Sequence, residues 1–575
     1  MEKSKQTNPE LIKVAKQTFM TSSTLVGDVP NRIGVEQYTV LYKNTFIYDK
    51  NNPITKIDQK IDNIEIKKNS LILIPSPVLF YGLKSLYNKL PENCFILCIE
   101  YEKELYDLKE SPESDFLPEI EYINITDKDF FFNYFDSRKN LSFIKHILFL
   151  PLNKGYLLHK DFYTECYDNL KRNLKQFLKN SLTLYSLGKR YYKNLILNLP
   201  SWSKEKDIKE LKIEKPVVIT GAGESIEKAL PLLKNNRELF KIIAIDTSLK
   251  TLTNFGITPD FVIAVESQFY NISDFVGNSA SSISLIADMT TYHLTSRIFS
   301  GDKYYFTSNF TTSNFLEILK ADNLIPTFIP PLGSVGVTAL YIASMITNSF
   351  IFYTGLDFSF IIGKTHAKDS PPITDTLIHW TKLSEKNNYS VSINANLIEA
   401  GKRSNNIIYT TSVLKSYAET MKNIISKNMR IFSLFSSPAV VENKNIVLDE
   451  KAFVAMLRSG VVSPASNSPA ASDSPNALKN RSSLDNKSNK IKAFLENELG
   501  KIERIINSGV DFLNGISQNS NADIIKQLTE KSDYLLPYYP AANNSKTLDS
   551  VTVKYILLSC YSFSKAIKNV LHQDA

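Results

Sequence analysis

Between residues 216 and 359, short apolar segments alternate with stretches of helical periodicity. The apolar segments are as long as strands and span residues 216–220, 241–248, 260–267, 282–290, 303–309 and 349–359. Helical stretches separate several of them, at residues 225–235, 249–256 and 336–346. Apolar strands separated by helices specify a mostly parallel sheet that is covered on both faces. The pattern therefore predicts an α/β fold with a central, mostly parallel, Rossmann-like sheet.

The chain is too long for a single hydrophobic core, because 575 residues exceed the size at which one core stops growing. A strand, helix and strand pattern at residues 70–102 predicts a smaller α/β domain before the central one. After residue 400 the alternation stops, a stretch rich in Ser, Asn, Pro and Ala follows, and the remainder has helical periodicity. We therefore expect an N-terminal α/β domain at 1–190, the central Rossmann-like domain at 191–400, a helical extension at 401–458, a flexible low-complexity linker at 459–490 and a C-terminal helical domain at 491–575.

Composition excludes several classes of protein. A hydrophobic content of 43% with 22% charged residues is typical of a folded globular chain, and the longest apolar runs are interrupted well short of the roughly 20 residues that span a bilayer. The first residues are charged and carry no apolar signal segment, so we expect a cytoplasmic protein without a membrane span. The net charge of +8 is spread along the chain without a basic run, which argues against a dedicated nucleic-acid surface.

The four cysteines are too few and too scattered for a disulfide scaffold. Cys94 and Cys98 flank three apolar residues within a strand-like run, where side chains four apart lie on one face. We therefore interpret them as buried structural thiols, with a metal-binding pair as the less favoured alternative.

The turn at Gly221-Ala222-Gly223 follows an apolar strand and opens a helix. Such a turn places backbone N–H groups and the positive end of a helix at one point, which suits a phosphate or another anion. The dinucleotide fingerprint requires a third glycine, and Ile226 occupies that position here. From these residues alone, a nucleotide site and an ordinary strand-to-helix turn are equally supported.

Polar residues also follow nearly every predicted strand. In parallel sheets the ligand lies at the carboxyl ends of the strands, so these residues are candidates for a site. Asp246, 25 residues after Gly221, is placed where a dinucleotide site carries its ribose-binding acid. Ser225 is also a good cap for the helix that follows it. The candidates at these strand ends are Gly221, Gly223, Ser225, Asp246, Glu266, Asp288, Thr307, Asn309 and Asp357.

Two later segments extend this set. A Gly-Ser turn opens the helix after residue 333, so Ser334 and the amides beside it offer a second anion-binding helix end. Beyond Asp357, a polar loop contains Lys364, His366 and Lys368. A histidine in such a loop titrates near neutral pH and can act as a general acid or base, although a solvated loop histidine without a role is also common.

Four segments, taken in order, resemble the central domain of the motility-associated Maf glycosyltransferases. They are GAGESIEKAL, AIDTSLKTLTNFGITPDFVIAVES, PLGSVGVTALYIASM and YTGLDFSFIIGKTHAKDS. The same domain group includes archaeal 6-hydroxymethylpterin diphosphokinases and is distantly similar to bacterial sialyltransferases. The resemblance covers residues 190–430, and it is more specific to the domain group than to one activity.

The resemblance implies a protein O-glycosyltransferase that acts in motility. Maf proteins are associated with the transfer of a nonulosonic acid, of the pseudaminic or legionaminic type, from its CMP-activated form to Ser or Thr of flagellin. Carried over to this chain, His366 and Asp357 would be catalytic, and the donor nucleotide would contact the glycine turns and the strand ends. The candidate donor-binding residues are then Gly221, Gly223, Ser225, Asp246, Glu266, Thr307, Asn309, Ser334 and Lys364.

Two positions depart from the family pattern. Glu224 stands where a proline is usual and adds a negative charge beside the first turn, and Ser359 stands where sialyltransferases carry a tyrosine that helps to hold phosphate. The sialyltransferase mechanism therefore cannot be copied to this chain. The acids of the central region, such as Asp288, are isolated and form no clear D-x-D pair, which favours a reaction without a metal. No cofactor is implied, and the CMP-sugar would be a co-substrate.

Two other functions are compatible with the sequence. A Mg²⁺-dependent diphosphokinase that acts on a pterin-like substrate belongs to the same domain group, but the long flanking regions have no evident use in that reaction. A non-catalytic flagellar binding or assembly protein would use the sheet as a scaffold, and the helical tail and the linker suit it. The sequence does not name the sugar, the acceptor residues or the oligomeric state, and the need for a divalent metal stays open.

Overall fold

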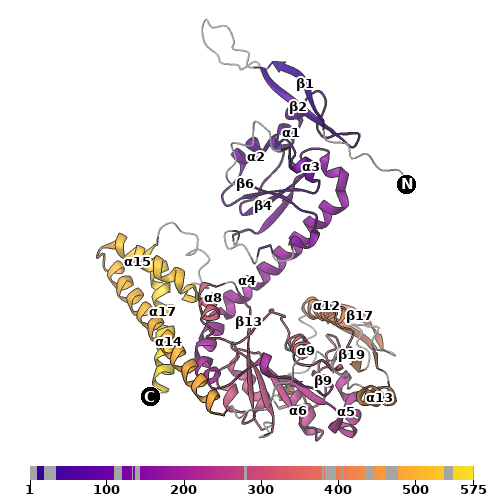
Figure 1. Ribbon diagram of the computed structural model, residues 1–575, viewed down its shortest axis with the longest axis vertical. Coiled ribbons are helices and arrows are strands. Elements are labelled where there is room, and N and C mark those ends of the chain that lie inside the picture. The colour runs from indigo at the N-terminus through magenta and orange to yellow at the C-terminus, as the bar shows by residue number, and fades with distance from the viewer. Residues whose placement is uncertain are drawn as a thin grey trace. The chain divides into compact units, whose positions relative to one another are not determined.

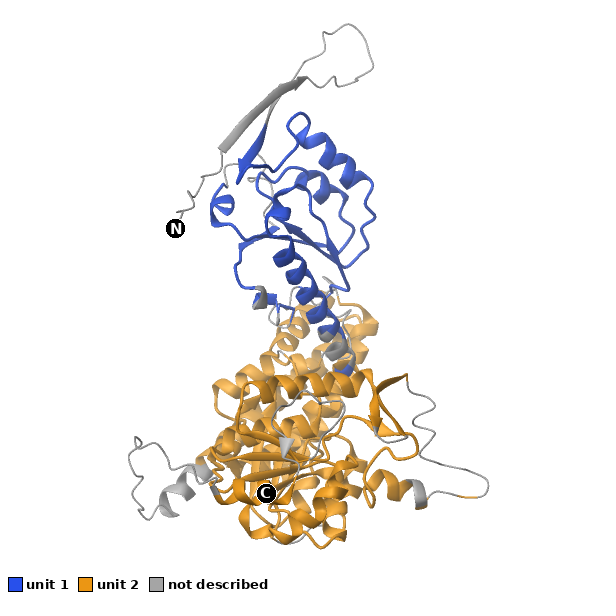
Figure 2. Ribbon diagram, turned by 90° about the vertical axis from the view of Figure 1, so that its right-hand side faces the viewer, with its two compact units in different colours: residues 1–183 blue, residues 184–575 orange. Residues whose placement is uncertain are grey.

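The computed structural model forms two compact units, residues 1–183 and 184–575 (Figure 2). The residues whose structure is described are 10–18, 34–108, 120–131, 134–135, 141, 143–277, 282–311, 313–378, 381, 396–403, 406–434, 446–447, 449–459, 477–535 and 548–573. Helix α4 (Lys160–Ser203) contributes its first half to the core of the first unit and its second half to the core of the second.

The N-terminal unit contains a four-stranded parallel sheet in the order β6-β5-β4-β7. Its strands are β4 (Ser70–Pro75), β5 (Phe95–Glu100), β6 (Ile120–Asn124) and β7 (His146–Phe149). Apolar side chains pack on both of its faces, together with the start of α4 and with α1 (Pro53–Asp62), α2 (Leu83–Lys89) and α3 (Lys103–Tyr106). A separate antiparallel sheet contains β1 (Glu10–Thr18), β2 (Gly34–Tyr42) and β3 (Thr45–Phe46). The predicted smaller α/β domain is confirmed.

The second unit is built on a ten-stranded sheet whose strand pairings are parallel. The strand order is β14-β13-β12-β11-β10-β9-β15-β19-β20, with β8 paired to β13. The strands are β8 (Lys206–Asp207), β9 (Val217–Thr220), β10 (Lys241–Ile245), β11 (Phe261–Ala264), β12 (Ser284–Asp288), β13 (Lys303–Ser308), β14 (Phe328–Ile329), β15 (Ile351–Thr354), β19 (Ile431–Leu434) and β20 (Ile446–Val447). The parallel α/β sheet that the alternating pattern predicts is confirmed.

Helices cover both faces of this sheet (Figure 1). They include α5 (Ser225–Asn235), α6 (Asp246–Asn254), α7 (Ile272–Phe275), α8 (Asn314–Ala321), α9 (Val335–Ile346), α12 (Ser412–Ser426) and α13 (Glu450–Ser459). Successive side chains of β9 point to opposite faces, so Val218 packs with side chains of α5 and α6, and Ile219 with those of α9 and α12. The central residues of β9, β10 and β11 are apolar because both faces of the sheet are buried there.

The order of the strands reverses at β9. From β9 the chain adds β10 to β14 toward one edge of the sheet, and β15 then pairs with the other side of β9. In open α/β sheets, ligands bind at the carboxyl ends of the strands beside such a switch point. The turns that follow β9 and β15 are therefore where the fold favours a site.

The region after residue 400 differs from the expected helical extension. Strands β17 (Leu397–Arg403) and β18 (Asn406–Thr411) form an antiparallel sheet with β16 (Phe360–Ile361), which is followed by helix α10 (Pro371–Ile378). Strand β19 joins the central sheet beside β15. The expectation of a purely helical extension at 401–458 is therefore wrong. Strand β19 is only four residues long, too short for its periodicity to reveal it.

The C-terminal residues form helices α14 (Ala477–Leu513), α15 (Gln518–Lys531) and α17 (Ser550–Gln573), as their periodicity predicts. Asp533 ties them to α8, because its carboxylate accepts hydrogen bonds from the backbone N–H groups of Asn314 (2.7 Å) and Phe315 (3.1 Å). The flexible linker expected at 459–490 is wrong in its second half, since α14 already begins at Ala477; residues 460–476 lie outside the described residues. Ala, Leu, Lys and Arg supply helix propensity there despite the Ser and Asn around them.

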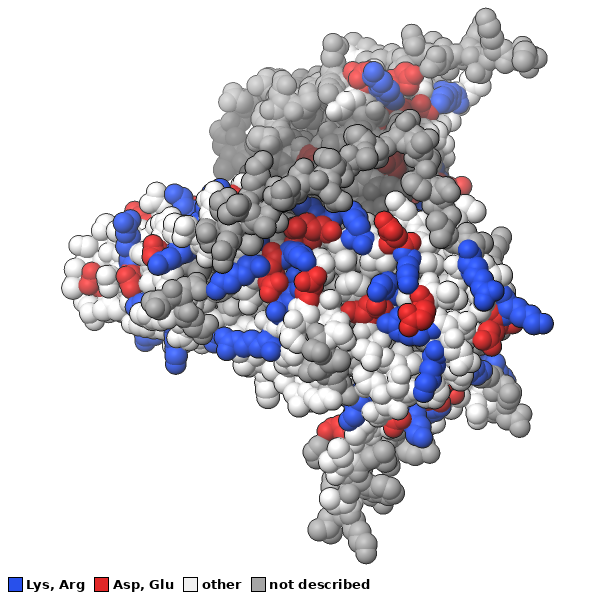
Figure 3. All heavy atoms as spheres, turned by 60° about the horizontal axis from the view of Figure 1, so that its bottom comes forward, with Lys and Arg blue, Asp and Glu red and all other residues white. Residues whose placement is uncertain are grey.

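The structure bears on three inferences drawn from composition, which concern the cysteines, membrane-spanning helices and a basic surface. Cys98 is buried and Cys94 is partly buried; both are free thiols, and Cys94 precedes β5 instead of lying within it. Within the described ranges, no helix combines the length and the apolar character needed to cross a membrane. On the described part of the face in Figure 3, Lys and Arg side chains are interspersed with Asp and Glu.

Candidate functional site at the carboxyl edge of the sheet

The carboxyl edge of the central sheet collects the polar residues that follow each strand in the sequence. Gly221 follows β9, Asp246 begins α6 directly after β10, and Glu266 follows β11. Asp288 ends β12, and Asp357 follows β15. Because these strands are parallel neighbours, their carboxyl ends lie along one edge. The candidate residues therefore share that edge, as the alternating pattern predicts.

The turn between β9 and α5 packs directly against the turn that follows β15. The backbone N–H of Gly221 donates to the carbonyl of Thr354 (2.8 Å), and that of Gly223 donates to the carbonyl of Gly355 (2.8 Å). A Cβ atom on Gly221 would lie 2.2 Å from the Gly355 carbonyl oxygen, closer than such atoms can approach. Gly355 itself has a φ of +69°, a conformation that favours glycine. The glycines are therefore required by the contact between two turns of the chain.

Asp357 occupies the N-terminal end of α5. Its Oδ2 accepts the backbone N–H of Ser225 (2.8 Å), and its Oδ1 accepts the Ser225 hydroxyl. The Ser225 Oγ in turn accepts the N–H of Gly355 (2.8 Å). The anion at this helix end is thus the chain's own carboxylate, where the helix dipole stabilises it. The amide of Gly223 thus bonds to Gly355, that of Ser225 bonds to Asp357, and Asp357 is a buried cap. The donor-binding and catalytic roles expected of these residues stay predictions.

The loop after β16 lies over the start of α5. Lys364 Nζ contacts the carboxylates of Glu227 (2.9 Å) and Glu224 (3.4 Å). The N–H of Ala367 donates to the carbonyl of Ala222 (2.7 Å), within the glycine turn. Glu224, the departure from the family pattern, therefore has a partner in this loop. The ion pairs place Lys364 beside the start of α5, and its expected contact with the donor stays a prediction.

His366 sits in the same loop and is partly buried. Its Nδ1 lies 3.1 Å from the hydroxyl oxygen of Thr365. Burial lowers the pKa of the imidazole below its usual value, so the ring is neutral at pH 7. A neutral imidazole can accept a proton, which is the chemistry expected of a general base.

The second predicted helix end is the start of α9. Ser334 is its N-cap, in extended backbone with φ −135° and ψ 136°, and its side chain forms no capping hydrogen bond. Gly333 before it has a φ of +73°, and a Cβ there would lie 2.9 Å from the ring of Tyr417. In the described structure, therefore, α5 begins at an internal carboxylate, whereas α9 begins without a side-chain cap. The first amides of α9 therefore donate no hydrogen bond to the side chain of their N-cap residue.

Asp246 belongs to a buried group of carboxylates after β10 and β11. Its Oδ1 accepts the N–H of Thr247 (2.8 Å), and the side-chain amide of Asn271 bridges its Oδ2 (3.1 Å) to Oδ2 of Asp274 (2.9 Å). Burial raises the pKa of Asp246 to about 6. Burial, with the charges of Asp246 and Glu266, raises the pKa of Asp274 to about 7. Near neutral pH this group can therefore hold a shared proton.

Sequence reasoning missed Asp274 because it lies in the short helix α7, away from any strand end. Its three-residue spacing from Asn271 places both on one helical face, which is the only signal available. The described residues include no group of three or more His, Cys, Asp or Glu side chains that could hold a metal ion.

Asp288 joins the ends of β12 and β13. Its Oδ1 accepts the N–H of Thr290 (2.7 Å) and its Oδ2 accepts that of Ser308 (3.1 Å). Thr307 is fully buried, and its hydroxyl donates to a carbonyl of the neighbouring loop (3.3 Å). Asn309, by contrast, is exposed at the edge. Thr307 is therefore buried in the sheet, whereas Asn309 is accessible, and the donor-binding role expected of both stays a prediction.

Helix α4 packs against the loops at this edge of the sheet. The side-chain amide of Asn194 donates to the carbonyls of Ser267 (3.0 Å) and Thr290 (2.9 Å), so it holds the loops after β11 and β12. Burial, followed by the charge of Glu266, raises the pKa of Tyr191 to about 12. Tyr191 thus lies beside the acids of the edge as a neutral hydroxyl.

This arrangement is similar to that of known proteins. Residues 193–363 match the profile of the family described as 6-hydroxymethylpterin diphosphokinase MptE-like. The solved structure of the Maf glycosyltransferase from Magnetospirillum magneticum AMB-1 matches with a TM-score of 0.52 and 12% sequence identity, over 93% of this chain and 89% of that one. The chain has the Maf fold, built around an MptE-like domain.

Two curated relatives come from Treponema pallidum (strain Nichols), and both are described as uncharacterized proteins. One is 28% identical over 370 residues, which make up 62% of this chain and 64% of the relative. The other is 29% identical over 98 residues, which make up 16% of this chain and 47% of the relative. The chain thus spans less than two thirds of the length of either relative, and neither description assigns an activity.

The MptE-like domain contains most of the candidate residues, but Lys364 and His366 lie just beyond its last matched residue, 363. Within the domain, sequence reasoning missed His293, which follows β12. Its Nδ1 is buried without a hydrogen-bond partner. Burial, followed by the charges of Arg297 and Lys193, lowers the pKa of His293. The signal was present in the sequence, since His293 follows a predicted strand as the other candidates do.

Proposed function

We propose that the chain is a protein O-glycosyltransferase that transfers a nonulosonic acid, of the pseudaminic or legionaminic type, from its CMP-activated form to Ser or Thr of flagellin in the cytoplasm. The observation that supports this most is the Maf fold, which extends over 93% of the chain and so includes the flanking regions as well as the MptE-like domain. The Maf-like sequence motifs occupy the turns of the polar carboxyl edge, which is where parallel sheets bind ligands.

Donor binding is assigned to the start of α9 and to the acids after β10 and β11. The phosphate of a CMP-sugar is an anion, and the amides beside Ser334 lack a side-chain cap that would compete with it. Asp246 and Glu266 would accept hydrogen bonds from hydroxyl groups of the ribose or of the sugar. Asn309 would complete the donor site from the end of β13. In this arrangement α5 has a supporting role, because Asp357 fixes the turn after β15 against it.

The transfer exchanges one bond for another at the anomeric carbon. The bond between this carbon and the CMP phosphate oxygen breaks, and a bond forms between the carbon and the acceptor hydroxyl oxygen. Amides at the start of α9 would stabilise the charge on the departing phosphate, while neutral His366 accepts the hydroxyl proton. His293 is a second imidazole at this edge with a lowered pKa and is the alternative proton acceptor. Positioning of the two reactants supplies the rest of the rate.

A diphosphokinase that acts on a pterin-like substrate is the second candidate, because residues 193–363 match a family with that description. Such an enzyme transfers a diphosphate group from ATP with Mg²⁺. The family match does not include the regions before residue 193 and after residue 363, and the diphosphokinase reaction has no evident need of them. The Maf structure, by contrast, matches over 93% of the chain and so includes both regions. We therefore favour glycosyl transfer.

The proposal is tested with the purified full chain and flagellin. Incubation with CMP-pseudaminic acid or CMP-legionaminic acid should release CMP and raise the intact mass of flagellin by whole nonulosonic acid residues. The matched control is Ser334→Glu, which places a carboxylate at the start of α9 and should abolish donor binding. Deletion of the gene in its host should correspondingly lower the mass of the filament protein.

Parallel reactions separate the alternatives. A product formed from ATP, Mg²⁺ and 6-hydroxymethylpterin, with no change in flagellin, would replace glycosyl transfer with diphosphokinase activity. Capture of unmodified flagellin without either product would instead support a non-catalytic assembly role.

A further inference from the structure

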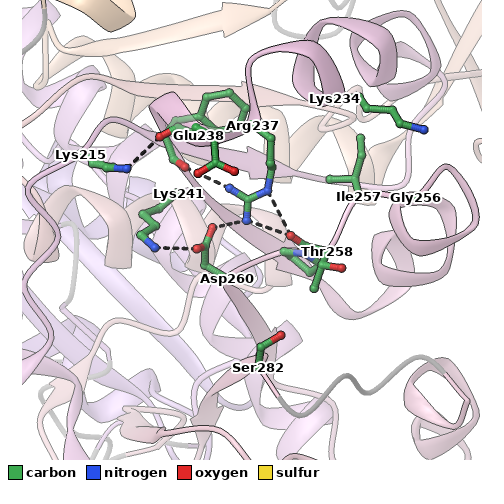
Figure 4. Close-up of a pocket in the computed structure, with 12 residues that line it drawn as sticks. Lys215, Lys234, Arg237, Glu238, Lys241, Gly256, Ile257, Thr258, Asp260 and Ser282 are labelled. Carbon is green, nitrogen blue, oxygen red and sulfur yellow. Dashed lines mark hydrogen bonds and ion pairs between the residues drawn. The ribbon is translucent and has the colours of Figure 1, made fainter.

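A separate pocket of ≈ 450 Å³ lies at the opposite, amino edge of the central sheet (Figure 4). It forms where α5 and α6 end and where β10 and β11 begin. The charged side chains of its lining are Lys215, Lys234, Arg237, Lys241, Glu238 and Asp260. The pocket therefore lies away from the carboxyl ends at which the transfer reaction is proposed.

Asp260 balances part of the positive charge. Its Oδ2 accepts Arg237 Nη2 (2.6 Å), and its Oδ1 accepts Lys241 Nζ (2.7 Å) (Figure 4). The backbone N–H of Ile242 also donates to Oδ2 (2.9 Å). Burial opposes ionisation of Asp260, but Lys241, Ile242 and Arg237 together lower its pKa, so it is a carboxylate at pH 7. One negative charge thus faces two positive ones.

Arg237 is fixed in the wall of the pocket. Its Nε and Nη2 donate to the carbonyl of Thr258 (3.1 and 2.8 Å), and its Nη1 donates to the carbonyl of Phe240 (3.1 Å). With Asp260 on the same guanidinium, these bonds join the loop after α5 to the loop before β11. Arg237 therefore supports the pocket, and the lysines are the groups that can move toward a ligand.

Lys215 and Lys234 form no ion pair in the described structure, and Lys234 Nζ also lies over the ring of Phe255, 5.2 Å from its centroid. Lys215 Nζ donates to the carbonyl of Glu238 (2.8 Å), and Lys234 Nζ donates to the carbonyl of Phe255 (3.0 Å). An ammonium group has three N–H donors, so each of these bonds leaves donors for a ligand. Gly256, with a φ of +78°, makes room for Lys234, because a Cβ there would lie 3.3 Å from its Nζ.

The lining keeps an excess of positive charge. It contains four basic and two acidic side chains. The C-terminal ends of α5 and α6, each equivalent to about half a negative charge, reduce this excess without cancelling it. Pockets for small ligands measure about 300–1,000 Å³, so this volume suits a small molecule and not a polymer. The expected ligand is therefore a small anion.

We propose that this pocket binds a small phosphorylated metabolite, with Lys215 and Lys241 on one side of the ligand and Lys234 on the other (Figure 4). A phosphate group suits the side of Lys215 and Lys241 because each of its oxygens can accept a charge-assisted hydrogen bond, and Lys234 would contact a polar group at the other end of the ligand. The three lysines come from separate segments: Lys215 precedes β9, Lys234 lies in the last turn of α5, and Lys241 begins β10. The proposal does not depend on glycosyl transfer.

Calorimetric titration of the full chain with inorganic pyrophosphate, at low ionic strength, tests this site. The wild-type chain should bind, and the double variant Lys215→Gln/Lys234→Gln should bind at least tenfold more weakly, because it loses two charge-assisted hydrogen bonds. The double variant keeps the Asp260 network, so its thermal unfolding should match that of the wild type. Added salt should weaken binding to the wild type, since charge is the main attraction.

Lys228→Gln is the matched control, because Lys228 is also exposed on α5 but lies outside the pocket. It should bind pyrophosphate as the wild type does. Equal affinities for the wild type and the double variant would overturn the proposal. So would a wild-type chain that binds neither pyrophosphate nor inorganic phosphate, or an equal loss in Lys228→Gln, which would indicate general attraction to a basic chain.

Discussion

Two helices begin at the carboxyl edge after a glycine turn, and they differ in what contacts their N-terminal ends. Helix α5 follows Gly221 and Gly223, and the carboxylate of Asp357 bonds to its first amide. Helix α9 follows Gly333, and Ser334 provides no side-chain cap. Both turns look like anion sites in the sequence; the first holds the carboxylate of Asp357, and we propose the second for the donor phosphate. A glycine turn before a helix thus indicates that another group lies close to the backbone of the turn, and that group can belong to the same chain.

The position of each turn in the sheet explains this difference. The turn before α5 leaves β9, whose neighbour β15 ends at the same level and turns back across it, so Gly221 and Gly355 meet. The turn before α9 instead follows β14, at the far edge of the strand order. The start of α9 nevertheless also meets the turn after β15, because a Cβ on Gly336 would lie 2.4 Å from the side chain of Leu356. That partner is apolar, whereas the partner of the α5 end is the carboxylate of Asp357.

The largest effect is expected from closing the space between the turns of β9 and β15. Gly221→Val would place side-chain atoms against the Gly355 carbonyl, 2.2 Å from where the Cβ would stand. The free energy of unfolding in urea should fall by about 3 kcal/mol or more. Gly500→Ala is the control, because nothing lies within 4 Å of its Cβ position, and it should be neutral or slightly stabilising. A Gly221→Val chain of normal stability would show that the two turns are not packed as described.

The loop that lies over α5 supplies the next prediction. His366→Ala should slow transfer by about 10²-fold, the scale for loss of a general base, while CMP affinity stays within a few-fold. Because burial lowers the pKa of His366, the wild-type rate should be flat above pH 7 and should fall on acidification, with a midpoint below 6.5. His293→Ala, measured beside it, identifies which imidazole accepts the proton. Unchanged turnover and an unchanged pH profile in His366→Ala would remove His366 from the mechanism.

A smaller loss of stability is expected when the internal anion is removed from α5. Asp357→Asn keeps the size of the side chain but replaces one accepting oxygen with an amide, so it should lower the free energy of unfolding by about 1–2 kcal/mol. Ser225→Ala should cost a similar amount, and the double variant should cost less than the sum, because the two side chains share one interaction. Additive losses in that cycle would mean that the side chains do not act together.

The sequence predicts the elements of this edge well because burial imposes a period on each of them. The helix expected at residues 225–235 is α5 (Ser225–Asn235), and the strand expected at 216–220 contains β9. The glycine positions were also correctly singled out, since few residues tolerate so close an approach. These features depend on residues that are close in the sequence, so a single sequence is enough to predict them.

The partners of the candidate residues depend on contacts that a single sequence does not display. Ser225 and Asp357 are 132 residues apart, and Lys364 and Glu227 are 137 apart. The sequence shows that each is polar and follows a strand or lies in a loop, but only the strand order brings them together. The glycine turn suggested an anion at this helix end, and only the fold shows that the carboxylate of Asp357 lies there.

The smallest expected effect tests the start of α9 itself. Because the Ser334 side chain forms no capping bond, Ser334→Ala should change the free energy of unfolding by less than about 0.5 kcal/mol, although loss of an ordinary cap costs about 1 kcal/mol. It should weaken CMP binding about tenfold, since a hydrogen bond from the hydroxyl to a charged phosphate is worth about 1.5 kcal/mol. Ser225→Ala should show the opposite pattern, with lower stability and unchanged CMP affinity. Calorimetry and urea unfolding on both variants compare the two helix ends directly, and a loss of CMP affinity in Ser225→Ala alone would move the nucleotide to α5.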